Sequence, residues 1–106
     1  MNDERRRAPR YQLIAQAEIV ELRSGAKVSA RTSDVSLVGC FMNSAHSFPE
    51  GTKVRLRLTR AEASFSSFGI VARLQPMGMG VSFAETEEEQ SKTLRAWLVD
   101  ASREVN

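Results

Sequence analysis

Several short segments of the chain alternate hydrophobic and polar residues, which is the pattern of β-strands with one buried face. In TKVRLRLT the hydrophobic Val54, Leu56 and Leu58 alternate with basic residues. Runs rich in β-branched and aliphatic residues predict further strands, over about 11–22, 27–34, 40–44, 64–74 and 78–84. Pro and Gly in HSFPEG predict a loop between two of these strands.

The last part of the chain has the period of a helix instead. One apolar face is formed by residues at i, i+3, i+4 and i+7, namely Leu94, Trp97, Leu98 and Ala101. Thr86 followed by Glu89 matches a capping box, in which the two side chains satisfy backbone donors at the helix start. The acidic residues from Glu85 to Glu89 then stand where the helix dipole favours negative charge, which explains the cluster without a metal site. The pattern predicts a helix over about 87–101.

A chain of 106 residues has the size of one domain. Five or six short antiparallel strands followed by one helix favour a closed or nearly closed barrel, because closure removes exposed strand edges. The helix is expected to close an end of this barrel or to cover one side. Residues 1–10 have almost no apolar content and contain Pro9, which predicts a flexible Arg-rich arm ahead of a barrel domain over 11–102.

Composition excludes several classes of function. No stretch approaches the roughly 18 apolar residues of a membrane helix, and no apolar core of a secretory signal follows MNDERRRAPR, so we expect a cytoplasmic protein without membrane insertion. Cys40 is the single cysteine, which excludes an internal disulfide and a cysteine-based zinc site and predicts a small buried residue. Because His46 is the single histidine and no glycine-rich phosphate loop is present, we expect no enzyme, no metal and no cofactor.

The basic residues indicate a planar anionic partner. All but three of the 15 Lys and Arg residues are Arg. Arg presents a planar fork that grips a phosphate or a purine edge at two points and stacks on a base, which Lys does not. Four of them crowd the first ten residues: Arg5, Arg6, Arg7 and Arg10. Arg6 and Arg10 are four residues apart across Pro9, and from there they could reach phosphates or the O6 and N7 acceptors of a guanine.

The stretch DVSLVG, from Asp34 to Gly39, offers the complementary chemistry. Asp34 and Ser36 are two apart, so on an extended backbone both leave from one face while Val35 points into the core. A carboxylate can accept both donors of a guanine edge, the N1 hydrogen and the 2-amino group. Gly39 permits a turn with positive φ and a close approach of a ligand to the backbone. Asp, Ser and Gly are also common turn residues, so a plain hairpin turn stays open as an explanation.

These residues carry a resemblance to a known family. Arg6-x-x-x-Arg10 matches the RxxxR signature of PilZ domains, and DVSLVG matches their (D/N)xSxxG signature at every defined position. GMGVSF, residues 78–83, looks like the family's closing strand before its C-terminal helix. The resemblance covers nearly the whole chain. It implies an all-β fold with a C-terminal helix, built as a six-stranded antiparallel β-barrel of the split-barrel type.

The resemblance also implies a non-enzymatic receptor for the bacterial second messenger cyclic di-GMP. Arg6 and Arg10 would clamp phosphate and guanine from the arm, while Asp34, Ser36 and Gly39 would hold guanine from the barrel surface. The arm would become ordered on binding and change the surface offered to a partner. That partner would be an unidentified protein of motility, secretion or exopolysaccharide machinery, with biofilm formation among the processes implied.

Two further positions bear on how the ligand would bind. In PilZ domains an arginine just before RxxxR is associated with an intercalated ligand dimer, and Arg5 holds that position, which implies two stacked nucleotides per site. Many members carry a tryptophan or other bulky residue on the penultimate strand, whereas GIVARL offers only Ile70 and Val71. Either apolar contact replaces stacking here, or affinity is reduced.

Two alternatives stay open. One is a PilZ-like protein-interaction module that does not bind nucleotide. The other is a small nucleic-acid-binding β-barrel that uses the basic arm. The acidic helix start and the lack of interleaved exposed aromatic residues argue against the second alternative, because proteins that bind single strands stack the bases on aromatic side chains.

Overall fold

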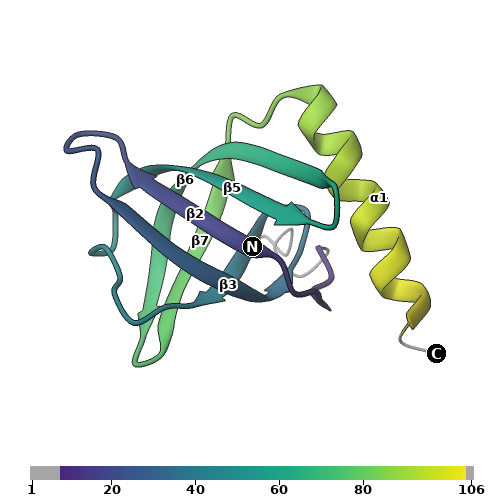
Figure 1. The fold of residues 1–106 in the computed structure, drawn as a ribbon, viewed down its shortest axis with the longest axis horizontal. Coiled ribbons are helices and arrows are strands. Elements are labelled where there is room, and N and C mark those ends of the chain that lie inside the picture. Colours follow the sequence, from purple (N-terminus) through teal and green to yellow (C-terminus); the bar gives the residue numbers. More distant parts are fainter. Residues whose placement is uncertain (1–7, 105–106) are drawn as a thin grey trace, which may run out of the picture.

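The computed structural model describes residues 8–104 of the chain. These residues fold into a β-barrel with a helix at one end (Figure 1). The elements are β1 (Tyr11–Gln12), β2 (Gln16–Glu21), β3 (Lys27–Val35), β4 (Gly39–Asn43), β5 (Lys53–Arg60), β6 (Ala63–Gln75), β7 (Gly78–Ala84) and α1 (Glu88–Glu104).

The strands form one antiparallel sheet in the order β1-β3-β2-β5-β6-β7-β4. A further pairing between β3 and β4 closes the sheet on itself, which removes the free edges of the ring. The short β1 pairs with the end of β3 beyond its pairing with β2 and adds no strand to the ring, so the ring is a closed six-stranded barrel. The predicted six-stranded antiparallel barrel with a C-terminal helix is confirmed.

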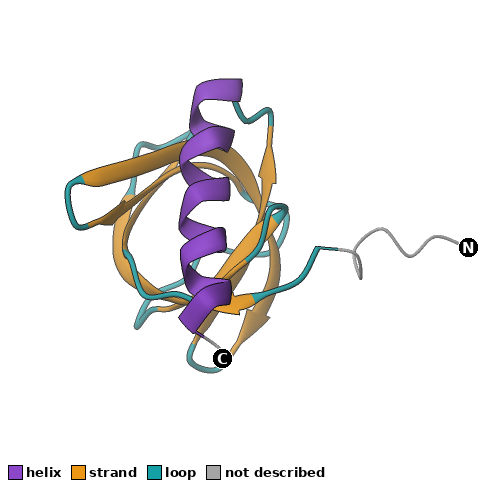
Figure 2. Ribbon diagram, turned by 90° about the vertical axis from the view of Figure 1, so that its right-hand side faces the viewer, coloured by secondary structure: helices purple, strands orange, loops and turns teal. Residues whose placement is uncertain are grey.

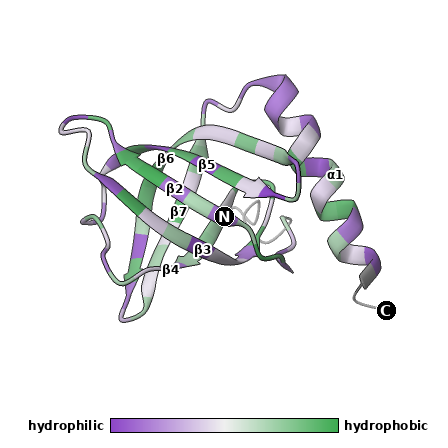
Figure 3. Cartoon of the chain, viewed as in Figure 1, coloured by the Kyte–Doolittle hydropathy of each residue, from purple (hydrophilic) through white to green (hydrophobic). Residues whose placement is uncertain are grey.

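Alternate residues of the strands fill the barrel interior. In β5, Val54, Leu56 and Leu58 are almost fully buried while the Arg residues between them are exposed, as the alternation predicted. Burial of such a side chain contributes about 1.5–3 kcal/mol. Phe65 of β6 is fully buried and packs at a tilt against Phe83 of β7, with ring centroids 5.1 Å apart. Figure 3 shows the resulting mixture of hydrophobic and hydrophilic positions along the strands.

The helix α1 crosses one end of the barrel, in front of the ring of strands in Figure 2. Its predicted apolar face is buried there, as Leu94, Trp97, Leu98 and Ala101. The helix contacts β6 and β1, so it closes an end of the barrel and does not cover a side. It ends at Glu104, beyond the predicted end near residue 101. No helix in the described part of the chain is long and apolar enough to cross a membrane.

The predicted capping box at the start of α1 does not form among the described residues. The hydroxyl of Thr86 instead shares a hydrogen bond with that of Ser67, at 2.7 Å between the oxygens. The backbone N–H of Ser91 donates to the carbonyl of Glu87 at 2.9 Å, which marks Glu87 as the residue that begins the helical bonding. Thr86 therefore joins the loop before α1 to β6, and its role is to hold the helix against the barrel.

The strand predicted over 11–22 is interrupted between β1 and β2. Leu13 and Ala15 are buried, so the alternation of buried and exposed side chains continues through the break. The backbone of the break bonds to the buried side chain of Thr32, whose hydroxyl accepts the Ala15 N–H at 2.8 Å and donates to the Leu13 carbonyl at 2.6 Å. Ahead of the break, β1 pairs with the end of β3, where Gln12 lies opposite Asp34. This path brings the residue before β1, Arg10, to the DVSLVG loop.

Candidate functional site

A cleft of about 500 Å³ lies on the outer surface of the barrel, where the residues before β1 meet strands β4, β7 and β6. The predicted site residues Arg10, Ser36 and Gly39 line it. Asp34 does not line this cleft, but it is joined to Arg10 by an ion pair. Arg5 and Arg6, the remaining predicted site residues, lie outside the described residues. Structure therefore brings together the described members of the two sequence motifs.

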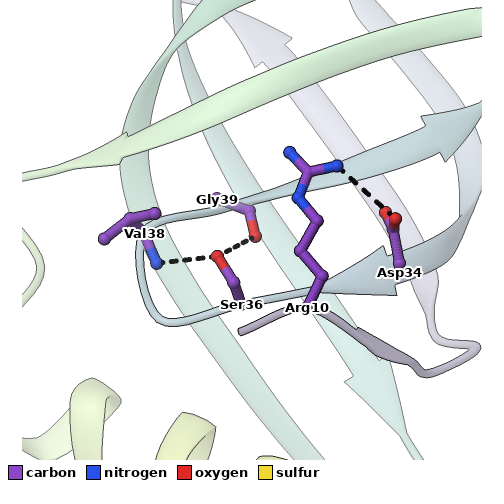
Figure 4. Close-up of polar contacts among 5 residues, drawn as sticks. All are labelled: Arg10, Asp34, Ser36, Val38 and Gly39. Atoms are coloured by element: carbon purple, nitrogen blue, oxygen red, sulfur yellow. Dashed lines mark hydrogen bonds and ion pairs between the residues drawn. The ribbon is translucent and has the colours of Figure 1, made fainter. Parts of the chain in front are cut away.

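Arg10 and Asp34 form the polar pair at this site (Figure 4). Nη1 of Arg10 lies 3.5 Å from Oδ2 of Asp34, and the two side chains are 53% and 30% exposed. A pair this long and this solvated contributes about 0–1 kcal/mol to stability. The other carboxylate oxygen, Oδ1 of Asp34, is buried and has no hydrogen-bond partner among the described residues. An unpaired buried acceptor costs about 1–3 kcal/mol. Asp34 can therefore accept a further hydrogen bond, which no described residue of the barrel donates.

Ser36 has a different role from the one that its spacing predicted. Its hydroxyl donates to the Gly39 carbonyl at 3.3 Å and accepts the Val38 N–H at 3.1 Å, as Figure 4 shows. Ser36 is only 1% exposed. Of the predicted carboxylate and hydroxyl, the hydroxyl is thus engaged by the backbone of its own loop, whereas the carboxylate keeps one oxygen without a partner among the described residues. Val35 points into the core, as predicted.

Gly39 is required by strand packing, and the prediction of a positive φ there is wrong. The described residues with positive φ are Gly25, Gly51, Ala61 and Glu85. A Cβ on Gly39 would lie 2.5 Å from the carbonyl oxygen of Val81 in β7, much closer than any carbon side chain tolerates. The glycine therefore allows β4 to approach β7 directly after the loop.

Strand register places four residues in one row across the barrel surface. Asp34 of β3 lies opposite Phe41 of β4, Phe41 lies opposite Gly80 of β7, and Gly80 lies opposite Arg73 of β6. Phe41, Gly80 and Arg73 all line the cleft. Sequence reasoning missed these three, although a glycine inside a strand pattern such as GMGVSF is a known sign of close approach by another group.

The expectation for the penultimate strand β6 is also wrong in its residues. Val71 is 1% exposed and faces the core, and neither Val71 nor Ile70 lines the cleft. A β-bulge between Val71 and Arg73 makes Ala72 an extra residue, so that Ala72 and Arg73 are both exposed and both line the cleft. The bulge itself, at residues 71–73, contains neither Gly nor Pro that would mark it in the sequence.

Cys40 is buried beneath the site, and its thiol is expected to be unreactive. Burial and, to a smaller extent, the negative charge of Asp34 raise the pKa of its thiol to about 12, while the charge of Arg10 acts in the opposite direction. The predicted burial of this residue is confirmed. A thiol with so high a pKa stays protonated at neutral pH and is a poor nucleophile. Within residues 8–104, no three His, Cys, Asp or Glu side chains gather as a metal site.

The structure is a small β-barrel with a cleft on its surface, and comparisons with known proteins place it in a family. The model of the PilZ domain family matches residues 4–100. The chain belongs to the PilZ domain family, whose domains are in general non-enzymatic receptors of cyclic di-GMP. A comparison with curated protein sequences finds no match.

Solved structures share this fold at low sequence identity. The PilZ domain of YcgR from Escherichia coli, solved with cyclic di-GMP, has a TM-score of 0.77 and 14% identity, over 95% of this chain and 94% of that one. The PilZ domain of CeSA from a cellulose-synthesizing bacterium has a TM-score of 0.69 and 14% identity, over 86% and 96%. The Bacillus subtilis inhibitor of motility MotI/DgrA has a TM-score of 0.72 and 19% identity, over 94% of this chain and 50% of that one.

Proposed function

We propose that this protein is a receptor for cyclic di-GMP that binds the nucleotide in the cleft beside Asp34. One observation carries the proposal: the buried Oδ1 of Asp34 has no hydrogen-bond partner among the described residues, at a site where Arg10 supplies positive charge. A guanine edge offers two adjacent donors to such a carboxylate. The cyclic phosphodiester of the ligand offers negative charge to the arginines.

Each residue of the two motifs has a part in this proposal. Asp34 accepts the N1 hydrogen and the 2-amino group of a guanine. Arg10 is already held near Asp34 and turns its planar fork to a phosphate or to the O6 and N7 edge of a base. Ser36 and Gly39 act through the loop, because they fix its backbone and the approach of β4 to β7. Arg6 supplies the second fork from the arm.

Signalling is proposed to run through the arm, residues 1–10. When the ligand engages Arg6 and Arg10, the arm becomes ordered over the cleft and offers a new surface to a partner protein. The entropy cost of such ordering must be exceeded by the ligand contacts. The partner is proposed to belong to motility, secretion or exopolysaccharide machinery, in the cytoplasm of a bacterium. The motility inhibitor and the CeSA domain among the similar structures support these processes.

Isothermal titration calorimetry with cyclic di-GMP tests the proposal. The unaltered protein is expected to give saturable binding, and both Asp34→Ala and Arg6→Ala are expected to weaken it by about 100-fold, since each removes charge-assisted hydrogen bonds worth about 3 kcal/mol together. Asp100→Ala and Arg23→Ala change exposed residues outside the cleft and serve as matched controls. Absence of saturable heat with the unaltered protein at high micromolar ligand would contradict the proposal and favour an interaction module that binds no nucleotide.

The same titration gives the stoichiometry. Two nucleotides per protein are expected if Arg5 supports an intercalated ligand dimer, and Arg5→Ala should then reduce the ratio to one. A ratio of one with the unaltered protein would contradict the role proposed for Arg5 while leaving the receptor function intact.

A further inference from the structure

The row from Asp34 to Arg73 contains an opening, here named the Gly80 gap, between the side chains of Phe41 and Arg73 above Gly80. A Cβ placed on Gly80 would lie 3.7 Å from Cδ1 of Phe41 and 3.8 Å from Cβ of Arg73. Both neighbours therefore stand on the outward face where Gly80 lacks a side chain. All three residues line the cleft of the proposed nucleotide site.

The Gly80 gap has room for one planar ring. Neighbouring strands lie about 4.8 Å apart, so β4 and β6, on the two sides of β7, are separated by about 10 Å. A ring in van der Waals contact on both faces needs about 7–8 Å between the groups that flank it. A side chain of the size of valine at position 80 would fill this space.

The two sides of the Gly80 gap suit a purine. Phe41 supplies an aromatic ring, and it lies on the outward side of β4 because its neighbours Cys40 and Met42 are buried in the core. Arg73 presents a planar cation, and among the described residues no carboxylate forms an ion pair with it. Nucleic-acid bases stack on aromatic rings and on guanidinium planes alike.

We propose that the Gly80 gap is a stacking subsite, in which a purine ring of the bound nucleotide lies between Phe41 and Arg73. This inference rests on the proposed function, because the ring belongs to a ligand of the same cleft. Asp34 then reads the edge of a base, whereas Phe41 and Arg73 bind a base by its faces. Stacking adds affinity for any purine, so the choice of guanine over adenine is left to Asp34.

Three variants test the subsite by calorimetry with cyclic di-GMP. Gly80→Val fills the gap, and Phe41→Leu removes the aromatic face at similar volume. Each is expected to weaken binding about 10-fold, within the range of stacking on one aromatic side chain. Arg73→Lys keeps the charge and loses the plane, for which we expect about three-fold weaker binding. The hypochromic change of the ligand's ultraviolet absorbance on binding should decrease in all three.

Matched controls lie on the same barrel outside the cleft. Phe68→Leu changes a phenylalanine of β6 that is 41% exposed, and Arg57→Lys changes an exposed arginine of β5. Neither should alter affinity or hypochromism. Thermal unfolding of every variant checks the fold, and Arg73→Lys, at an exposed position, keeps the test valid if Phe41→Leu lowers stability.

Outcomes separate the subsite from the receptor function. If the unaltered protein binds and Gly80→Val and Phe41→Leu bind equally well, the subsite is overturned and the receptor function stands. If Arg73→Lys keeps both affinity and hypochromism while Arg73→Gln loses affinity, Arg73 acts as a charge only and its stacking role is overturned. If the unaltered protein does not bind cyclic di-GMP, the receptor function and the subsite are both overturned.

Discussion

The residues at the cleft fall into two sets, here named the DVSLVG wall (34–39) and the strand wall (Phe41, Gly80 and Arg73), which are used in different ways. In the DVSLVG wall, Ser36 bonds to the backbone of its own loop and Gly39 makes room for Val81. In the strand wall, Phe41 and Arg73 line the cleft, and no ion pair among the described residues involves Arg73. A sequence motif with fixed spacing thus mostly records what a loop needs in order to form. Residues that contact a ligand without a structural task leave no such spacing.

The largest difference between the walls is expected from adding one methyl group to Gly39. In Gly39→Ala the new Cβ meets the Val81 carbonyl oxygen at 2.5 Å, and neither strand can move without breaking the β4–β7 pairing. We expect the free energy of unfolding to fall by about 3 kcal/mol, at the upper end for overpacking. Urea unfolding followed by the fluorescence of Trp97 measures it. A free energy of unfolding within about 0.5 kcal/mol of that of the unaltered protein, which is the usual range for surface substitutions, would contradict the packing role.

Asp34 is the described motif residue whose side chain keeps an acceptor without a partner among the described residues, so its substitution should separate affinity from stability. Asp34→Asn replaces an acceptor oxygen by a donor amide that opposes the guanine donors. We expect cyclic di-GMP affinity to fall about 30-fold, equivalent to about 2 kcal/mol. Stability should change by less than about 1 kcal/mol, because the ion pair with Arg10 is long and solvated. A large loss of stability with unchanged affinity would reverse the roles assigned to Asp34 and Gly39.

Ser36→Ala should have a smaller effect, and on stability first. It removes the acceptor of the Val38 N–H and the donor to the Gly39 carbonyl. We expect a loss of about 1 kcal/mol in the free energy of unfolding, the usual net value of such bonds, with a weaker decrease in affinity as the loop loosens. Calorimetry and urea unfolding of one preparation measure both. A loss of affinity at unchanged stability would instead assign Ser36 a direct contact with the ligand.

The fold was largely predictable because its information is local. Alternation with a period of two gave the strands, and the spacing of Leu94, Trp97, Leu98 and Ala101 gave the buried face of α1. The break between β1 and β2 was not predictable, because the alternation continues through it and its backbone is satisfied by Thr32, 17 residues beyond Ala15 along the chain. The capping box failed for a similar reason, since the hydroxyl of Thr86 found a partner in β6.

The candidate site was predictable in one wall only. Asp34 and Arg10 were found because their chemistry matches a guanine and their motifs have fixed spacing, and the structure places them 3.5 Å apart. Phe41, Gly80 and Arg73 come from three strands, and their row depends on strand register and on the bulge at Ala72. Neither the register nor the bulge can be inferred from the local sequence pattern, so these three residues could be recognised only in the structure.

The smallest expected effect is the counterpart of the largest one, because Gly80→Ala makes the same substitution in the strand wall. The new Cβ would meet its nearest atoms at 3.7–3.9 Å, which is ordinary contact, and the φ of Gly80 is not positive. We expect the free energy of unfolding to rise by about 0.5 kcal/mol, since alanine restricts the unfolded chain more than glycine does. Affinity for cyclic di-GMP should fall only about two-fold, because one methyl group raises the floor of the Gly80 gap without filling it, whereas Gly80→Val fills it.

Parallel urea unfolding of Gly39→Ala and Gly80→Ala makes the comparison direct. Equal losses of stability would show that the two glycines serve packing alike and would remove the distinction between the two walls.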